Sequence, residues 1–548
     1  MSKRRRKVLK SRIRSPAVRN SGYSDGGASW QKDALRSWHP LRLSSKSDID
    51  ANLTTLRNRA ADQATNTPLG SAAIVTSTMH AVGAGLRLFP RIPYKLLGLT
   101  ADEARDWERN TTREFRLWAE SKECDWRRRN NFYDLQSIAY ATYLTDGDSF
   151  ALFRRANPSY ITSYTLRIQL LEANRVSNPL GPAAMYSEAN AWGIEQLNPD
   201  NGNHIINGVE VTPDGRLEAY WVSNKVPGDL VDIDGATNWT RIEAFGSCTG
   251  LPNMLQVCHD IRAEQYRGVP YLAPVLENLK QIGRYCNAEL TAAIIRSFLS
   301  IFFTNTQASN SLDNILPSAY GAPDDDHAGE PVVDAAQYKL GPGQLNSLPK
   351  GVDVKTVDSS NAQIAYDSYM THLEKSVAAS LNIPYEVLLK CFSSSYSASR
   401  GALLQAQDEF KTRRRWFAAD FCQPIYEQWL MEAVATGRIS CPGFFTDPVK
   451  RRAWCSADWF GPTMSILDPI KDVNGAALRV KYGLTTRERE AAEMTGSDLE
   501  ENLEQIAYEQ ALIKNLGLDI GNPEVLAGSS LTQEGDGEEN EKSSAKQT

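Results

Sequence analysis

The 548-residue sequence lacks the long apolar runs and short motifs that mark many membrane proteins and enzymes. No stretch of about 18 apolar residues occurs, so we expect no transmembrane helix and no membrane partner. The sequence has no G-x-x-x-x-G-K-[ST] loop, no H-E-x-x-H motif and no G-x-S-x-G motif. ATPases of the P-loop class, zinc peptidases and serine hydrolases are therefore disfavoured. These absences predict a protein that is not an enzyme and needs no cofactor.

Cysteine and histidine are also sparse. The eight cysteines include no C-x-x-C pair, and the six histidines are scattered without the spacing of metal ligands. The basic start of the chain is not followed by the apolar segment of a signal peptide. We therefore expect reduced, mostly buried thiols and no zinc framework. One weak carboxylate set remains, Asp324 with Asp353 and Lys355, which a metal-dependent nuclease could use.

Charge is unevenly distributed along the chain. The formal net charge of -6 is small for this length and does not indicate a nucleic-acid-binding protein. Nine Lys and Arg residues nevertheless fall within residues 1–19, and five acidic residues fall within the last fifteen. Like-charge blocks of this kind are typical of solvated tails. The basic arm, residues 1–29, is either a solubilising tail or an electrostatic contact with nucleic-acid phosphates.

The hydrophobic content of 41% supports real cores, and the length predicts two to four structural units. Helical periodicity is expected at 48–84, with a break at Pro68, and at 132–144. The residues from Thr100 to Glu103 form a capping box that begins a further helix. Alternation predicts strands near 150–152, 164–170 and 255–261, and one hairpin over 204–222 about its Asp-Gly turn, whereas 224–252 is expected to be loop-rich. The fold class predicted from this pattern is α+β.

Two long helices bracket an insertion in the middle of the chain. The first is expected from Tyr271 to Leu299, and its apolar stripe has helical spacing. The second is expected from near Asn361 to Asn382. Between them lie short strands near 301–304 and 352–355 and a polar, acidic excursion. The stripe consists of Leu272, Val275, Leu279, Ile282 and Cys286.

The last third of the chain is predicted to be largely helical. A Ser-rich loop, 390–399, ends at Ser397 or Ser399 as an N-cap. A helix from Arg400 to Thr436, kinked at Pro424, follows, and aromatic loops and turns are expected over 441–466. Capping boxes at 485–488 and 497–500 begin two more helices. The second of these is expected to turn Leu499, Leu503 and Ile506 inward.

A series of short segments occurs along the chain in a fixed order. They are LEANRV (171–176), IINGVEVTPDGRLEAYWV (205–222), QYRGVPYLAPVL (265–276), YCNAELTAA (285–293), LGPG (340–343), ASLNIPY (379–385), YSASR (396–400), PTMSILDPI (462–470) and GLT (483–485). In their number and order these segments resemble the portal proteins of tailed bacteriophages, in particular the lambda-like family. The resemblance spans roughly residues 40–515.

The resemblance implies a portal-protein fold with a wing, a two-helix stem, an inserted clip and a helical crown, assembled as a ring that is typically a dodecamer. It implies these divisions of the chain: a basic arm 1–29, a wing 30–268 and 384–465, a first stem helix 269–300, a clip 301–357, a second stem helix 358–383, a tunnel loop 390–399, a long helix 400–436, a crown 466–515 and an acidic tail 516–548.

The function implied by the resemblance is a channel at one capsid vertex for packaging and ejecting the genome. The implied partners are double-stranded DNA, the large terminase subunit, the major capsid protein and head-completion or connector proteins. The implied locations are the virion and, during assembly, the host cytoplasm. The candidate channel residues are Lys280, Arg284, Ser393, Ser394, Ser395, Tyr396 and Ser397. The candidate partner-facing residues of the clip are Asp324, Asp325, Asp326, Tyr338 and Lys339.

Alternatives stay open at this point. Lys280 and Arg284 share a helical face, and they either line the channel or pair with Glu277 or a neighbouring subunit. The Ser-rich loop either contacts DNA or is an ordinary surface loop. The protein as a whole could instead be the metal-dependent nuclease noted above, or another ring or adaptor of the virion.

Overall fold

The computed structural model describes residues 33–516 except 34, 159, 161, 180–194, 230–236, 298–300, 306–351, 357–365, 393–394, 464–468 and 498. The predicted basic arm, most of the predicted clip and nearly all of the acidic tail lie outside the described residues. The described residues combine many helices with small antiparallel sheets, which agrees with the α+β prediction.

Helices form the first layer of the main body, and local signals set their ends. Pro68 opens α2, as the predicted break requires. The capping box of α4 is present, with the Glu103 N–H donating to Thr100 Oγ1 at 3.3 Å and Thr100 N–H to the Glu103 carboxylate at 2.8 Å. Gly147 ends α5 in the left-handed region, with φ +90°. The bounds are α1 Leu53–Asn66, α2 Pro68–Ala81, α3 Tyr94–Leu97, α4 Ala101–Glu120 and α5 Phe132–Asp146.

Two antiparallel sheets pack beside these helices. The first has the order β3-β2-β9, and the second runs in chain order from β4 to β8. The Asp-Gly turn predicted within 204–222 is present, but the segment is two hairpins rather than one. Asn207 and Gly208, with φ of 46° and 85°, form a tight turn between β5 and β6 that the sequence analysis missed. The bounds are β2 Asp148–Arg155, β3 Leu166–Leu171, β4 Glu195–Leu197, β5 His204–Ile206, β6 Val209–Val211, β7 Leu217–Ser223, β8 Trp239–Glu243 and β9 Met254–Cys258.

Strand β8 lies within 224–252, a region that was expected to be loop-rich, and the strand itself was not predicted. Similarly, the region 441–466 contains the helix α11 (Pro448–Trp454) and the strand β12 (Ala457–Phe460). Asp447 caps α11 by accepting from the Val449 N–H at 2.8 Å. Strand β12 pairs with β1 (Arg87–Pro90), more than 360 residues earlier in the chain. Short strands completed by such distant partners give little local signal.

The long aromatic-rich helix starts earlier than predicted, and it is interrupted just before the proline at which a kink was expected. Helix α9 (Tyr396–Phe417) begins at Tyr396 rather than Arg400, because Ser395 is the N-cap and neither Ser397 nor Ser399 is. A π-helical turn (Ala418–Cys422) then interrupts the helix, and Pro424 lies at the start of α10 (Gln423–Ala435). Proline has no N–H and its ring crowds the carbonyl four residues earlier, so the interruption falls just before it.

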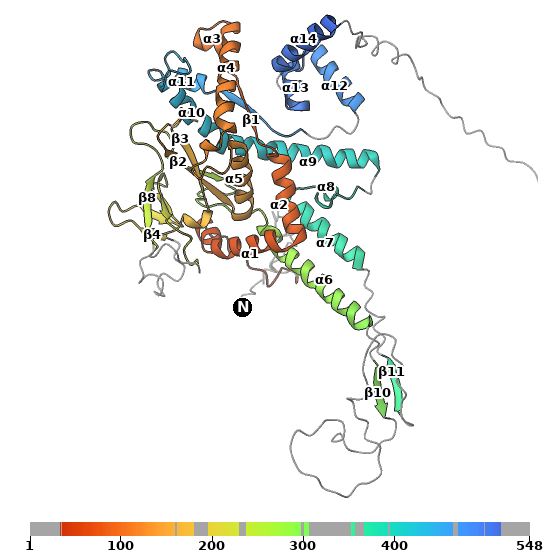
Figure 1. Ribbon diagram of the computed structural model, residues 1–548. Coiled ribbons are helices and arrows are strands. Elements are labelled where there is room, and N and C mark those ends of the chain that lie inside the picture. The colour runs from red at the N-terminus through yellow and green to blue at the C-terminus, as the bar shows by residue number, and fades with distance from the viewer. Residues whose placement is uncertain are drawn as a thin grey trace, which may run out of the picture.

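The core lies where α9 and α10 pass between the helical layer and the β3-β2-β9 sheet (Figure 1). Phe115 of α4 contacts Trp429 of α10 edge to face, with ring centroids 5.1 Å apart, and Phe132 stacks on Phe421 at 6.2 Å. Aromatic pairs of this geometry add to the stability that burial provides. The wing-like body is therefore one packed unit built from both ends of the chain.

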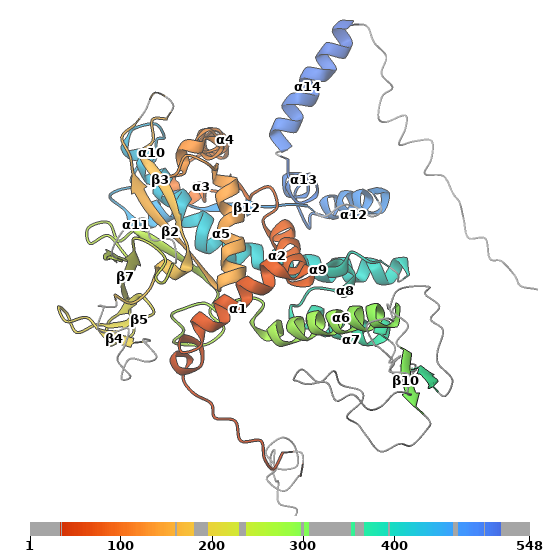
Figure 2. The same cartoon turned by 60° about the horizontal axis from the view of Figure 1, so that its bottom comes forward.

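Two helices leave this body side by side. Helix α6 (Leu276–Ser297) follows a 3-10 turn (Ala273–Val275), so it begins five residues after the predicted start at Tyr271. Helix α7 is described as Tyr366–Ser380. Figures 1 and 2 show α6 and α7 projecting together, with the antiparallel pair β10 (Ile301–Asn305) and β11 (Val352–Thr356) beyond their far ends. The predicted order of helix, inserted strands and helix is confirmed.

Three C-terminal helices stand beside the top of the body (Figure 1). Helix α12 was not predicted, and α13 is capped by Thr486 rather than by the predicted box at 485–488. The prediction that α14 turns Leu503 and Ile506 inward is wrong. Leu503 is 54% exposed and Ile506 46% exposed, and α14 has no buried residue. The bounds are α12 Pro469–Lys481, α13 Arg487–Thr495 and α14 Leu499–Leu516.

Candidate functional site

A buried ion pair lies where the α6–α7 pair meets the body. Arg267, just before α6, places Nε 2.6 Å and Nη2 3.2 Å from the two carboxylate oxygens of Asp148, at the start of β2. Arg57 of α1 adds a third contact at 2.6 Å, and none of these three side chains is more than 4% exposed. Burial acts to raise the pKa of Asp148, but the two arginine charges outweigh it and lower that pKa.

Arg267 also uses its remaining N–H groups. It donates to the carbonyls of Ala173 at 3.0 Å and Val176 at 2.9 Å, and to that of Asn207 in the β5–β6 turn. Two sheets and the first projecting helix are thereby joined at one guanidinium. The sequence pattern around Arg267 does not indicate this acidic partner, which lies 119 residues earlier in the chain.

Tyr271 joins the base of the first projecting helix to the end of the second. Its hydroxyl donates to the Leu381 carbonyl, just past α7, and the Arg413 guanidinium of α9 lies over its ring at 4.5 Å. The predicted stripe on α6 is confirmed at its base, where Leu272, Val275 and Leu279 are at most 2% exposed. Farther along, Ile282 and Cys286 are half-buried.

Aromatic contacts connect the two helices farther from the body. Tyr285 of α6 stacks on Tyr366 of α7 at 5.3 Å and meets Tyr369 edge to face at 5.1 Å. Beyond this cluster, Leu290 is 61% and Ile294 49% exposed. The α6–α7 pair therefore leaves an apolar surface uncovered in the single chain.

A sequence model described as phage portal protein, lambda family, matches residues 31–414, which is most of the chain. The chain belongs to this family. It is 26% identical to portal protein B of Escherichia phage lambda, over 91% of each chain. It is 25% identical to the portal protein of Escherichia phage N15, over 91% of this chain and 92% of that one.

Among solved structures, the chain is similar to one from the neck of a native gene transfer agent particle computed with C12 symmetry. The identity is 11% and the TM-score 0.38, over 80% of this chain and 92% of that chain. A chain from the neck of the empty particle gives a TM-score of 0.40 at 10% identity, with the same coverage of both chains.

In this portal-family chain, the predicted channel residues are only partly described. Lys280 and Arg284 are exposed, and within the described residues neither has an ion-pair partner within 4 Å, Glu277 included. The pKa of Asp62 in α1 is lowered, chiefly by a hydrogen bond from Asn66 and in smaller part by the charge of Lys280. The base of α6 thus places Lys280 toward an acidic neighbour that the sequence did not suggest.

The described part of the Ser-rich segment includes the start of a helix. Ser395 caps α9, and Tyr396 and Ser397 are the first residues of that helix, with Tyr396 53% exposed. The expectation that 390–399 is loop throughout is therefore wrong for its last residues. Ser393 and Ser394 lie outside the described residues. No contact joins Ser395–Ser397 to Lys280 or Arg284 among the residues described.

The predicted clip residues Asp324, Asp325, Asp326, Tyr338 and Lys339 all lie outside the described residues. Asp353 and Lys355, the other members of the weak carboxylate set, are on β11 opposite Thr304 and Phe302. Within the described ranges, no three His, Cys, Asp or Glu residues gather to form a metal site. The described helices also include none that is both long and apolar enough to cross a membrane.

All eight cysteines are free thiols. Four of them, Cys124, Cys422, Cys441 and Cys455, are buried, two are half-buried and two are exposed. Burial raises the pKa of Cys441 and of Cys455 to about 12, so both remain neutral. The expectation that most of the thiols are buried holds for half of them.

Proposed function

We propose that the chain assembles into a ring of twelve copies, which forms the channel at one capsid vertex for packaging and ejecting DNA. Membership of the lambda portal family carries this proposal. The α6–α7 pair supports it, because two projecting helices with exposed apolar side chains need a neighbour to cover them. The role is structural rather than catalytic.

The divisions of the chain follow from this proposal. The body made of 30–268 and 384–465 is the wing, and 269–300 with 358–383 is the stem. The segment 301–357 is the clip, which docks the large terminase subunit and later the head-completion or connector proteins. The helices of 466–515 are the crown. The wing meets the major capsid protein, so the protein is located in the virion and, during assembly, in the host cytoplasm.

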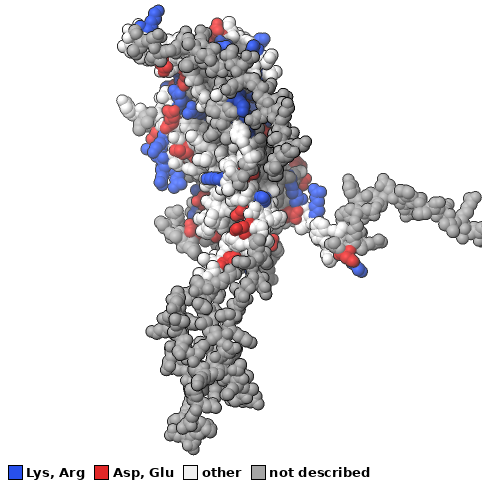
Figure 3. All heavy atoms as spheres, turned by 90° about the vertical axis from the view of Figure 1, so that its right-hand side faces the viewer, with Lys and Arg blue, Asp and Glu red and all other residues white. Residues whose placement is uncertain are grey.

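A DNA channel must hold the duplex without gripping it, because tight phosphate contacts would slow sliding. The face in Figure 3 shows Lys and Arg side chains interspersed with Asp and Glu rather than a field of one sign. We assign Lys280 and Arg284 to sparse cationic rings within the channel. The Ser-rich segment 390–399 supplies small polar groups at the same bore.

Native mass spectrometry of the purified full chain, with negative-stain images, tests the ring. Twelve chains of 60.8 kDa predict a mass of about 730 kDa and a particle with a central hole. Rings of a neighbouring symmetry would also support the proposal. A monomer or dimer that persists at high concentration would overturn it.

The nuclease alternative makes a separate prediction. Metal-dependent cleavage of duplex DNA that disappears in the variant Asp353→Ala would favour it. We expect the wild-type chain and this variant to leave DNA equally intact in Mg²⁺ or Mn²⁺.

A further inference from the structure

Ion pairs connect the C-terminal helices to the body, and the two sides of this boundary carry opposite charges. Among the residues that the structure describes, the ion pairs resolved across this boundary place the cation on the body and the acid on the C-terminal helices. On the body they involve α4, the end of β1 and α9. The pairs are Arg91–Glu488 at 3.2 Å, Arg109–Glu500 at 2.7 Å, Arg109–Glu504 and Arg113–Glu504 at 3.7 Å, Arg116–Glu501 at 3.2 Å, Arg400–Asp472 at 2.8 Å and Lys411–Glu493 at 4.0 Å.

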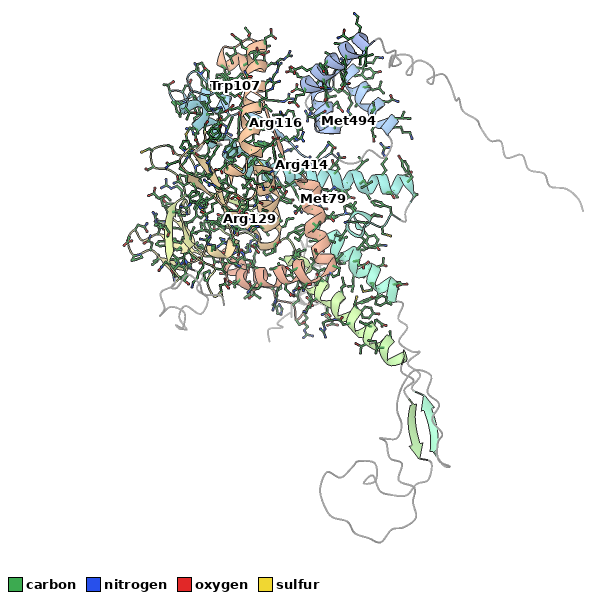
Figure 4. The ribbon with its side chains drawn as sticks, viewed as in Figure 1. Met79, Trp107, Arg116, Arg129, Arg414 and Met494 are labelled. Carbon is green, nitrogen blue, oxygen red and sulfur yellow. The ribbon has the colours of Figure 1, made fainter. Side chains whose placement is uncertain are left out.

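Helix α4 contributes the most regular part of this interface. Arg109, Arg113 and Arg116 recur at helical spacing and form a row on one face. Opposite them, Glu500 and Glu504 lie one turn apart on α14. Figure 4 shows Arg116 on α4 and Met494 on α13, from the two sides of the boundary. The match between the arginine row and the acidic helix is therefore a match between two regular charge patterns.

Apolar packing does not hold α14 in place. No residue of α14 is buried, and within the described residues the main hydrophobic core has no member beyond Trp459. A cavity of about 360 Å³ lies at the boundary, lined by Arg87 and Arg116 from the body and by Gly496 and Glu501 from the C-terminal helices. The side chains of the α4–α14 pairs are 36–58% exposed. Exposed pairs of this kind are individually weak and are screened by salt.

We propose that α14 is an ionic latch over a cationic row on the body, and that duplex DNA is the alternative occupant of that row. An acidic helix presents carboxylates at intervals along one face, much as a nucleic-acid strand presents phosphates. A duplex offers many phosphates at once and displaces the helix where the two compete. The choice of DNA as the second occupant rests on the proposed channel function. The contact between α14 and the arginine row does not depend on that function.

Hydrogen exchange measured by mass spectrometry tests the latch. We expect exchange in α14 to rise as NaCl increases from 0.05 to 1 M, where the screening length falls to about 3 Å. The variant Arg109→Glu raises exchange roughly tenfold at low salt, because it replaces two attractions with repulsions. The double variant Arg109→Glu with Glu500→Arg restores protection. The variant Glu509→Gln is the matched control, since Glu509 is on α14 but accepts a hydrogen bond from Gln505 of the same helix.

Fluorescence anisotropy with a 30-base-pair duplex tests the second occupant. The triple variant Glu500→Gln, Glu501→Gln and Glu504→Gln frees the arginine row. We expect it to bind the duplex at least tenfold more tightly than wild type, with a salt dependence steeper by about 3 in log–log slope for three freed contacts. Glu509→Gln should change neither quantity.

The outcomes separate the two ideas. Exchange in α14 that is insensitive to salt and to Arg109→Glu would overturn the latch, whatever the oligomeric state. A salt-sensitive latch whose triple variant binds DNA no better than wild type would overturn DNA as the occupant. Failure of the chain to form rings would count against the proposed channel and leave the exchange result for the latch standing.

Discussion

Arg267 and Asp148, 119 residues apart in the sequence, form a two-pronged ion pair that is almost fully withdrawn from solvent. The arginine directly precedes the first projecting helix, and the aspartate begins the central strand of the β3-β2-β9 sheet. Movement of the helix relative to the wing-like body would have to break this contact. The Arg267–Asp148 ion pair therefore anchors the first projecting helix to the body.

Removing one side of this ion pair should destabilise the protein strongly. The variant Arg267→Met leaves Arg57 as the one cation paired with Asp148, and it removes the hydrogen bonds that Arg267 donates to three backbone carbonyls. Loss of one partner of a buried ion pair costs about 3–5 kcal/mol. Denaturant unfolding of the two proteins measures this difference. Arg216→Met, at an ion-pair arginine whose side chain is 77% exposed, is the control and should change stability by less than about 0.5 kcal/mol.

Alanine substitutions at Gly268 and Gly283 should change the free energy of unfolding in opposite directions. A Cβ at Gly268 would lie 1.8 Å from the Gly147 carbonyl oxygen, so backbone must move to accept it. We expect Gly268→Ala to lower the free energy of unfolding by more than about 2 kcal/mol. At Gly283, inside α6, a Cβ meets nothing within 4 Å, so Gly283→Ala should raise it by about 0.5–1 kcal/mol. Equal melting temperatures for the two variants would contradict this account.

The raised pKa of Asp50 should make the stability of the protein depend on pH, with a sign that follows from the direction of the shift. Burial raises its pKa to about 6, with partial opposition from the hydrogen bond that Asn207 donates. The folded state therefore holds this proton more tightly than the unfolded state, whose pKa is 3.8. Stability from this group is present below about pH 4 and is lost as pH rises to 6, by up to roughly 3 kcal/mol.

The variant Asp50→Asn keeps an oxygen for Asn207 and removes the titration. Its free energy of unfolding should decline less than that of the wild type between pH 4 and 6, as measured by urea unfolding at several pH values. Part of the decline remains, because burial also raises the pKa values of Asp146 and Asp420 to about 6. Parallel profiles for the two proteins would show that Asp50 titrates normally. The exposed Asp214→Asn in the β6–β7 turn is a control for loss of a carboxylate.

The apolar far part of α6 should matter for assembly and not for the fold of one chain. Leu290 and Ile294 are exposed, so replacing both with Glu should leave the unfolding of the chain within about 0.5 kcal/mol of wild type. In a ring the same positions would bury charge against a neighbour, which disfavours association. Native mass spectra should then shift from rings to smaller species. Leu197→Glu, at another exposed apolar position, is the control, and unchanged rings in the double variant would contradict the assignment.

The elements that the sequence predicted well are those whose signals lie within a few residues. The Thr100–Glu103 box, the break at Pro68 and the Asp-Gly turn at 214–215 each depend on hydrogen bonds or steric limits between near neighbours. The order of the two long helices and the strands between them also followed from local periodicity. The family followed from the resemblance of many short segments, which the match over residues 31–414 confirms.

Tertiary structure decided what local pattern leaves open. The sequence held several serines able to cap α9, and the structure has Ser395 as the N-cap. The pairing of β1 with β12 and of Arg267 with Asp148 depends on groups that meet only when distant segments pack. Helical spacing in α14 indicated an apolar face, yet it could not say whether this chain covers that face. Periodicity shows which side chains share a surface, and only the packed chain shows what lies against it.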